Sequence, residues 1–218
     1  LGATHAGMLP YTPDSGQGVN PGLNVKQLLG DKPVRAYVLL NFEPEWDVAQ
    51  PSSALKALQD AGLVVCLSLY ATDKMREYAD FILPIAPFTE TAGSYVNVAG
   101  QQQVFAPASV PHGESKPAWK ILRALANFLE LDGFDYKSAQ AVREEFEKNK
   151  RVEIKSTMPL VLPEMSEELH RYAALPMYDS DAIVRRSAPL SATNLKCCAN
   201  IAINAATAQK HGLTPGQS

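Results

Sequence analysis

Apolar runs and segments with helical spacing alternate along the N-terminal part of the chain. Three runs rich in apolar residues predict strands: VRAYVLLNF at 34–42, LVVCLSLY at 63–70 and FILPI at 81–85. The first two are expected to be buried. Between the three runs, SSALKALQDAG at 52–62 and TDKMREYAD at 72–80 place apolar residues one helical turn apart. The second run is nearly continuous in apolar residues, which is typical of a parallel strand covered on both faces. The order strand, helix, strand, helix, strand predicts a parallel sheet with right-handed crossovers, and therefore an α/β fold.

Residue types that favour helix ends set the limits of these two helices. Ser52 or Ser53 is expected to cap the first helix, and Gly62 is expected to end it. Thr72 is expected to cap the second helix. The polar segment EPEWDVAQP at 43–51, between the first strand and the first helix, predicts a turn.

A loop and a short helix are expected before the first strand. Residues 1–22 are rich in Gly, Pro, Asn and Ser, a composition that favours a loop. The stretch LNVKQLLGDK at 23–32 predicts a short helix that ends at Gly30.

A hairpin and two helices are expected after the third strand. The polar loop FTETAG at 88–93 leads into two short strands, SYVNV and QQVFAP, which turn at Ala99 and Gly100. Pro117 begins a helix over AWKILRALANFLEL. The apolar stripe of that helix consists of Trp119, Ile121, Leu122, Leu125, Phe128 and Leu129. The stretch at 136–150 predicts another helix, with Lys and Arg interleaved among its carboxylates.

The character of the sequence divides the chain into three parts. Residues 1–150 are expected to form the α/β domain. Residues 151–192 carry four prolines and predict an extended connector that lies across another surface. Residues 193–218 predict the truncated start of a C-terminal domain, with a strand, a helix stopped by Gly212 and a turn.

Composition and charge narrow the classes of function. With 46% hydrophobic and 20% charged residues, the chain has the composition of a globular domain. A net charge of −3 and a pI near 5.8 argue against nucleic acid as a partner, because no basic stripe is present. No apolar run approaches the roughly 18 residues that a membrane helix needs, so direct membrane insertion is not expected. The chain opens without an initiator methionine, and we expect it to be a segment of a longer polypeptide.

Cysteine and histidine patterns predict neither a metal site nor an iron–sulfur cluster in this chain. Cys66 lies in an apolar run, where a small buried thiol is expected. Cys197 and Cys198 are adjacent, and no CxxC spacing accompanies them. The four histidines stand far apart in the sequence: His5, His112, His170 and His211. No catalytic residue is predicted from these patterns.

Two further stretches resemble known kinds of ligand site only in part: the glycine-rich GQGVNPG and the acidic EPEWD turn. The stretch GQGVNPG does not match a dinucleotide fingerprint, because the spacing of Gly16, Gly18 and Gly22 is wrong and no strand precedes them. A flexible loop is the better interpretation there. Three carboxylates follow the carboxyl end of the first predicted strand, beside Trp46: Glu43, Glu45 and Asp47. They are typical of a capped surface turn, and a small-ligand site is the alternative.

The strongest candidate site is the loop and hairpin FTETAGSYVNVAGQQQVF at 88–105. It follows the third predicted strand, and open α/β sheets hold their ligands at the carboxyl ends of strands. Gly93 and Gly100 allow a close backbone approach or a positive φ. Hydrogen-bonding side chains come from Thr89, Thr91 and Asn97.

These residues carry a resemblance to a known family. The stretch FILPIAPFTETAGSYVNVAGQQQVF, followed by GESKPAWKILRALANFLEL, resembles the molybdopterin oxidoreductase superfamily. More closely, it is similar to the G-subunit family of bacterial NADH:quinone oxidoreductase, respiratory complex I. Further similar stretches are GLNVKQLLG, AYVLLNFEPEWD, EYADFILPIAPFTET and LPMYDSDAIVRRSAPLSAT. The resemblance runs from about Gly22 to Gly216 and is most specific from Tyr78 to Leu131.

The resemblance also implies which positions of the loop would contact a cofactor. Catalytic members carry E-x-x-G-T-x-x-N-x-E-G-R, and the matching residues here are Glu90, Gly93, Asn97 and Gly100, with Ser94 at the Thr position. The acidic position holds Ala99 and the Arg position holds Gln101. Without that carboxylate and guanidinium, the loop lacks its charge-assisted contacts to a phosphate-bearing cofactor. The resemblance therefore implies a vestigial site, formed by Glu90, Thr91, Gly93, Asn97 and Gly100.

The fold implied is α/β, a parallel Rossmann-like sheet layered by helices, followed by an extended connector and the truncated start of a β-barrel domain. The function implied is that of a non-catalytic structural segment. Its parent complex would pass electrons from NADH through flavin and iron–sulfur clusters to quinone, coupled to proton translocation. The clusters are expected elsewhere in the parent subunit, with no cofactor in this segment. The partners implied are other subunits of the complex I peripheral arm, on the cytoplasmic side of the bacterial inner membrane.

Two alternatives remain open at this point. The chain could be the cofactor-binding domain of a molybdopterin-dependent oxidoreductase, such as a formate dehydrogenase, with the cofactor at the FTETAG loop. It could also be a small-ligand-binding α/β domain that uses the EPEWD turn.

Overall fold

The protein is described here from a computed structural model, which defines residues 23–97, 99, 101–149, 177–193 and 202–214. The chain divides into two compact units, Leu1–Glu167 and Glu168–Ser218. The division of the chain at residues 150 and 192 stays a prediction.

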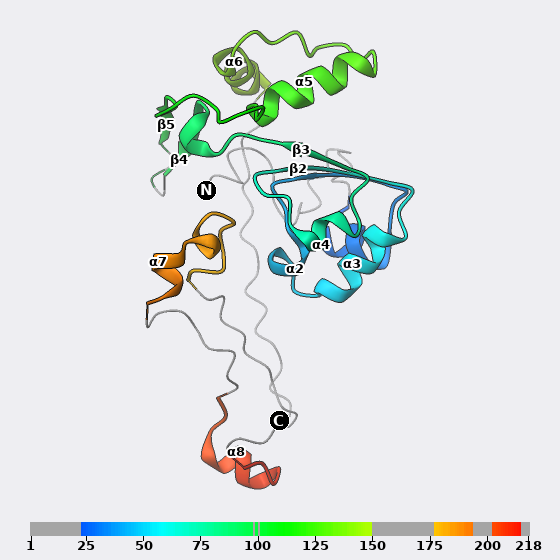
Figure 1. The fold of residues 1–218 in the computed structure, drawn as a ribbon, viewed down its shortest axis with the longest axis vertical. Coiled ribbons are helices and arrows are strands. Elements are labelled where there is room, and N and C mark those ends of the chain that lie inside the picture. The colour runs from blue at the N-terminus through cyan, green and yellow to red at the C-terminus, as the bar shows by residue number, and fades with distance from the viewer. Residues whose placement is uncertain (1–22, 98, 100, 150–176, 194–201, 215–218) are drawn as a thin grey trace. The chain divides into compact units, whose positions relative to one another are not determined.

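The first unit is built on three parallel strands (Figure 1). They are β1 (Ala36–Leu40), β2 (Leu63–Ser68) and β3 (Phe81–Pro84), hydrogen-bonded in the order β1-β2-β3. Helices α3 (Pro51–Gln59) and α4 (Asp73–Arg76) connect them and lie on the same side of the sheet (Figure 1). This arrangement confirms the predicted parallel α/β sheet and its strand–helix order.

The hydrophobic core lies between the sheet and these helices. Its buried members are Leu29, Tyr37, Leu39, Ala54, Leu58, Val64, Cys66, Met75 and Tyr78. Full burial of a side chain such as Leu58 stabilises the fold by about 1.5–3 kcal/mol. The Tyr37 hydroxyl donates to the carbonyl oxygen of Leu28 at 2.7 Å and accepts from the Val34 amide at 3.1 Å. These bonds attach the segment before β1 to the core.

The other face of the sheet differs from the prediction. In β1 the side chains alternate, with Tyr37 and Leu39 buried while Val38 and Leu40 are 54% and 49% exposed. Phe81 in β3 is 59% exposed. The expectation that β1 is a buried strand therefore holds for one of its faces only, because successive side chains point to opposite faces. In β2 the consecutive residues Cys66, Leu67 and Ser68 are all buried, as expected of a strand covered on both faces.

Two local predictions before β2 also need correction. Helix α3 begins at Pro51 with Gln50 as its N-cap, so neither Ser52 nor Ser53 caps it. Proline is favoured at the first helical position, where its missing N–H costs nothing. The predicted turn at 43–51 contains the short helix α2 (Pro44–Asp47). The short helix predicted at 23–32 is confirmed: residues 25–31 are helical, the π-helix η1 (Gln27–Asp31) forms most of it, and it ends one residue after Gly30.

The N-cap predicted at Thr72 is confirmed. Its hydroxyl oxygen accepts from the Met75 amide at 3.0 Å, which satisfies a donor at the start of α4 that has no partner within the helix.

The chain after β3 forms a hairpin and two helices. These elements are η2 (Phe88–Glu90), β4 (Gly93–Val96), β5 (Gln102–Phe105), α5 (Ala118–Phe128) and α6 (Ala139–Asn149). Strands β4 and β5 pair antiparallel, as predicted. Backbone bonds tie the start of α5 to the end of β3, since the Ala86 amide donates to the Lys116 carbonyl at 2.9 Å. The predicted apolar stripe of α5 does not extend to its end, because Phe128 is 85% and Leu129 61% exposed.

In the second unit the described residues form three short helices. They are η3 (Val184–Arg186), α7 (Ala188–Ser191) and α8 (Ala205–Lys210). Residues 177–192 of the predicted connector thus form turns and short helices, so this part is not extended, and 151–176 lie outside the described residues. Gly212, with φ +66°, follows α8 as predicted. The predicted strand before α8 lies mostly outside the described residues, and the barrel start is not confirmed.

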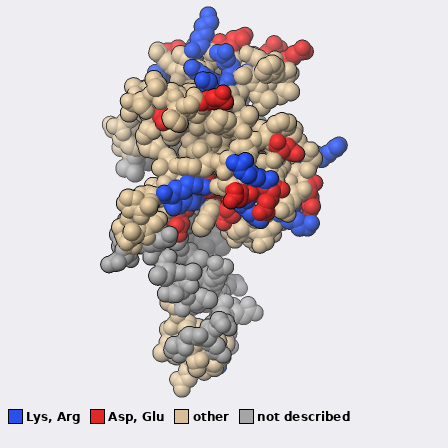
Figure 2. All heavy atoms as spheres, viewed as in Figure 1, with Lys and Arg blue, Asp and Glu red and all other residues tan. Residues whose placement is uncertain are grey.

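Charged side chains of both signs lie close together over the face shown in Figure 2. Lys and Arg neighbour Asp and Glu over the region of α5 and α6 and again over the region of α2 to α4 (Figures 1 and 2). Within the described ranges, none of the helices has the length and apolar character needed to cross a membrane.

Candidate functional site

The hairpin turn is organised by Asn97, one of the predicted site residues. Its Oδ1 accepts from the backbone amides of Ala99 at 3.0 Å and Gln101 at 2.9 Å. Its Nδ2 donates to Oε1 of Gln101 at 3.0 Å. A side-chain amide that bonds the backbone a few residues ahead is a common way to fix a turn. Both ends of the Asn97 amide are therefore used inside the hairpin, and Gly100 lies outside the described residues.

Glu90 and Thr91, two further predicted site residues, also bond within the chain. Glu90 ends η2, and its Oε2 accepts from the His112 amide at 2.9 Å. This bond joins the FTETAG loop to the segment that leads into α5. The Thr91 hydroxyl lies 3.4 Å from the carbonyl oxygen of Ala92, at the long end of hydrogen-bond distance.

Gly93 is needed for a close approach rather than for an unusual backbone angle. It lies in β4 opposite Phe105, and a Cβ added to it would lie 2.6 Å from Cζ of the Phe105 ring. The Phe105 ring stacks on Tyr95, with centroids 5.1 Å apart and planes 12° from parallel. Of the two roles that the sequence allowed for this glycine, the structure shows the first.

Two adjoining hollows lie beside this hairpin, between it and the helices α5 and α6. The larger has a volume of about 710 Å³ and is lined mainly by apolar and aromatic side chains, among them Val104, Phe105, Trp119, Val142 and Phe146. The smaller, of about 490 Å³, is lined by Glu90, Thr91, prolines and the three lysines Lys116, Lys120 and Lys137. Ala92, Trp119 and Ala139 line both hollows. We call the pair the hairpin groove.

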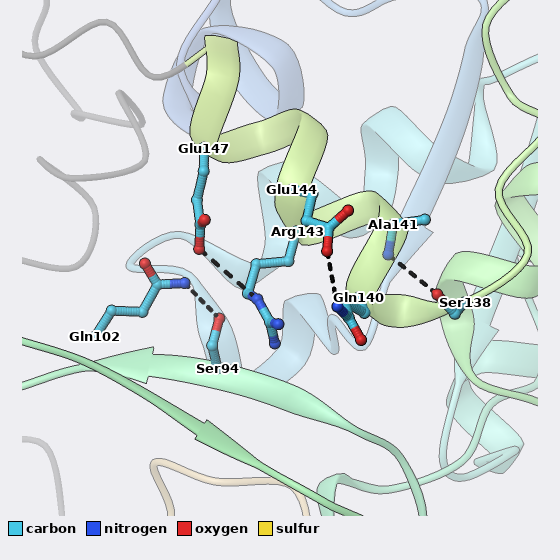
Figure 3. A network of polar contacts seen from close by, with 8 residues as sticks. All are labelled: Ser94, Gln102, Ser138, Gln140, Ala141, Arg143, Glu144 and Glu147. Carbon is cyan, nitrogen blue, oxygen red and sulfur yellow. Dashed lines mark hydrogen bonds and ion pairs between the residues drawn. The ribbon is translucent and has the colours of Figure 1, made fainter.

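Polar side chains face one another across the larger hollow (Figure 3). Arg143 and Glu147 point from α6 toward the hairpin, where Ser94 points toward α6 (Figure 3). Nε of Arg143 lies 3.7 Å from Oε1 of Glu147, and Gln102 donates to Oγ of Ser94 at 3.3 Å. Ser138 caps α6 through the Ala141 amide at 3.1 Å. The groove thus combines an apolar floor with a guanidinium at its edge.

The second predicted location, at the carboxyl end of β1, is a helix cap with buried carboxylates. The Asp47 carboxylate accepts from the Glu43 amide at 2.7 Å, so an acid in the first turn of α2 caps the start of that helix. Glu43 is only 2% exposed. Among the residues that the structure describes, Oε2 of Glu45 is buried without a hydrogen-bond partner.

Cys66 and Tyr78 lie near these carboxylates and respond to them. Burial, with a smaller contribution from the Glu45 charge, raises the pKa of the Cys66 thiol to about 11. Burial also raises the pKa of the Tyr78 hydroxyl, and the charges of Glu45 and its neighbours add to this shift. A thiol with a raised pKa is a poor nucleophile at neutral pH, so this corner favours stability over covalent chemistry.

The strand order gives a further reason against a ligand crevice in this sheet. Open α/β sheets hold ligands where the strand order reverses and the crossover helices change sides. The three described strands follow one another without a reversal, and α3 and α4 share one face. The carboxyl ends of β1 and β2 therefore lie side by side beneath local turns, such as that in which the Ser68 hydroxyl donates to the Tyr70 carbonyl at 2.9 Å.

The remaining predicted positions are scattered. His112 is exposed in the segment before α5, and His211 follows α8. Cys66 is buried, as predicted. Among the described residues, no three His, Cys, Asp or Glu side chains are grouped so that they could hold a metal ion. The other positions considered lie outside the described residues: Gly16, Gly18, Gly22, His5, His170, Cys197 and Cys198.

Sequence reasoning missed the hairpin groove and the buried Tyr78. The groove brings together the 92–106 and 137–146 segments, and no local pattern links them. The sequence does contain a signal for the groove, namely the lysines Lys116, Lys120 and Lys137 together with Trp119. It can be interpreted only when the position of the loop between α5 and α6 is known.

A comparison with protein-family models decides the family. A model described as molybdopterin oxidoreductase matches residues 3–128. The chain belongs to the molybdopterin oxidoreductase family. The match covers the parallel sheet, the hairpin and α5, which are the elements that carry the resemblance in the sequence.

Several relatives of this molybdopterin oxidoreductase chain are named as subunits of NADH-quinone or NADH-ubiquinone oxidoreductases. The G subunit of NADH-quinone oxidoreductase from Mycobacterium bovis is 34% identical over 119 residues, which is 53% of this chain and 14% of the relative. The mitochondrial 78 kDa subunit of NADH-ubiquinone oxidoreductase from Candida albicans is 44% identical over 52 residues, 24% of this chain and 7% of the relative. A Staphylococcus aureus protein named as a formate dehydrogenase is 40% identical over 68 residues, 31% of this chain and 7% of the relative. The matched regions thus span only a small part of each relative.

Among solved structures, the chain is similar to the acetylene hydratase from Pelobacter acetylenicus. The match has 24% sequence identity and a TM-score of 0.45, and it covers 56% of this chain and 19% of the hydratase. A similarity of this size supports no inference about function.

Proposed function

We propose that this chain is a non-catalytic, structural segment of the G subunit of an NADH:quinone oxidoreductase, respiratory complex I. The parent complex passes electrons from NADH through flavin and iron–sulfur clusters to quinone, coupled to proton translocation. The clusters belong to other parts of the parent subunit. The segment contacts other subunits of the peripheral arm, on the cytoplasmic side of the bacterial inner membrane. The similarity to the Mycobacterium bovis G subunit supports this assignment.

One observation carries the non-catalytic part of the proposal. The residue at the family's Arg position, Gln101, receives a hydrogen bond from Asn97 and completes the hairpin turn. Glu90 is bonded to the His112 amide. Asn97, Gln101 and Glu90 thus bond within the chain's own fold. The hairpin turn itself offers no cationic donor, and a phosphate-bearing pterin needs charge-assisted donors.

Metal and pterin analysis of the full-length parent subunit, purified from its own cells, tests this proposal. We expect iron without molybdenum, tungsten or released pterin, because the loop has lost its guanidinium. Molybdenum or tungsten near one per chain, together with pterin, would refute the structural role and make the FTETAG loop a cofactor site.

A second candidate function rests on the Staphylococcus aureus match. That protein is named as a formate dehydrogenase and is 40% identical to this chain, although over 68 residues only. In this alternative the chain is the cofactor-binding domain of a molybdopterin-dependent oxidoreductase. The Gln101→Arg change restores the Arg of the family pattern and tests the structural role against the enzyme. If the role is structural, the full-length Gln101→Arg variant should still contain no molybdenum cofactor. Cofactor already present in the unmodified protein would favour the enzyme.

A further inference from the structure

The hairpin groove has an excess of positive charge along its walls. Its charged lining residues are four cations and one carboxylate: Lys116, Lys120, Lys137, Arg143 and Glu90. Glu90 already accepts a hydrogen bond from His112, and Glu147 offsets part of the Arg143 charge. Within the part of the chain that the structure describes, none of the three lysines has an ion-pair partner. The chain as a whole is acidic, with a net charge of −3, so this local excess is not a property of the whole surface.

The floor of the groove is apolar and aromatic. Phe105, Trp119 and Phe146 line the larger hollow, and Trp119 continues into the smaller one. Val104 is 59% exposed, although it belongs to a paired strand. Nζ of Lys120 lies 5.6 Å from the centroid of the Trp119 ring, which keeps a cation at the boundary between the two hollows. The larger hollow therefore offers a place for an uncharged side chain, with Arg143 in its own lining and the three lysines in the lining of the adjoining hollow.

We propose that the hairpin groove is a docking surface for an acidic segment of a partner protein, which inserts one apolar or aromatic side chain between β5 and α6. The complementarity of charge favours this occupant, because carboxylates spaced along an extended segment can reach Lys116, Lys120 and Lys137 while the anchor enters the larger hollow. Two adjoining hollows also suit an extended segment better than one compact ligand. The inference does not depend on the proposed function, since it rests on the groove alone.

A binding measurement on the full-length protein tests the proposal. The probe is a short fluorescein-labelled synthetic peptide in which aspartates and glutamates flank one central phenylalanine. Fluorescence anisotropy then reports its dissociation constant at low and at physiological salt. We expect binding that weakens as salt is raised, because exposed charge pairs are screened.

Charge reversals in the groove are compared with a matched reversal elsewhere. Lys120→Glu and Lys137→Glu change exposed side chains and should leave the fold intact, which circular dichroism checks. Each should weaken peptide binding by about tenfold or more, while Lys32→Glu, an exposed lysine that lines neither hollow, should change it less than about twofold. A peptide with alanine in place of its phenylalanine should also bind more weakly, because the anchor is lost.

Several outcomes would overturn the proposal. One is equal weakening by Lys32→Glu, which would make the attraction non-specific. Another is undiminished binding of a peptide whose acidic residues are replaced by serines. A guanosine diphosphate probe that binds at Lys120 and Lys137 in place of the peptide would assign the groove to a nucleotide. Self-association of the protein that both reversals abolish would assign it to a second copy of the chain.

Discussion

At the scale of single residues, Gly93 must lack a side chain because of a neighbouring ring and not because of its own backbone angles. It lies in β4 without a positive φ, yet the Phe105 ring occupies the space that any Cβ would need. The stack of Phe105 on Tyr95 holds the ring there. The hairpin therefore depends on a glycine at this position for packing alone.

Replacement of Gly93 by alanine should destabilise the hairpin. The new methyl group would overlap the Phe105 ring, and the cost should be about 1–3 kcal/mol in the free energy of unfolding. Urea unfolding followed by circular dichroism measures it. The matched control is Gly30→Ala, where nothing lies within 4 Å of the added Cβ and stability should stay the same or rise. Equal effects of the two changes would contradict the packing role of Phe105.

Cys66 should make stability fall at alkaline pH. Its pKa rises from 9.0 to about 11 on folding, so the unfolded thiol loses its proton first as pH increases. The contribution to stability is fully present below about pH 9 and is lost as pH rises toward about 11. Urea unfolding across this interval should show a shallower decline in Cys66→Ala than in the unmodified chain. Parallel declines would show that the thiol does not titrate differently in the two states.

Tyr78 carries a buried hydroxyl without a hydrogen-bond partner among the described residues. Removal of such a group also removes its desolvation cost, so Tyr78→Phe should leave the free energy of unfolding unchanged or raise it by up to about 1 kcal/mol. Thermal unfolding at neutral pH checks this. A loss well beyond experimental error would mean that the hydroxyl bonds to a group not described here, such as a buried water.

At the scale of elements, helices α3 and α4 begin in two different ways, one with a proline in its first turn and the other with a side-chain N-cap. Thr72 caps α4 through its side chain, whereas α3 begins at Pro51 and makes no use of the two serines that follow. Thr72→Ala should therefore lower the free energy of unfolding by about 1 kcal/mol. Ser52→Ala should have little effect, since its hydroxyl caps nothing. A similar loss in both variants, measured by urea unfolding, would contradict this assignment of the caps.

The alternation in β1 gives a second contrast between neighbours. Leu39 is buried against α3 and its surroundings, and Leu39→Ala should cost about 2–5 kcal/mol. Val38, one residue earlier, is 54% exposed, and Val38→Ala should cost less than about 1 kcal/mol. Both values come from urea unfolding. A large loss at Val38 would contradict the exposure of this face of the sheet at β1.

These contrasts also show what the sequence could and could not predict. Strong apolar runs located β1, β2 and β3, because parallel strands need little beyond local pattern to be recognised. The residues of an apolar run do not show what covers each face of the strand, so Val38 was expected to be buried and is 54% exposed. Pro51 and Ser52 are adjacent, and they predict different first residues for α3. The local sequence does not decide between them, and the structure begins the helix at Pro51. The family loop was found from its glycines, yet the use of Asn97 and Gln101 inside the turn required coordinates.

At the scale of the whole molecule, the order of the strands has a consequence for how the chain folds. Among the strands that the structure describes, each parallel strand pairs with the next one along the chain. Contacts between near neighbours in sequence close small loops, which favours rapid folding. The sheet can therefore grow in the direction of synthesis, with β1 and β2 joined before β3 leaves the ribosome.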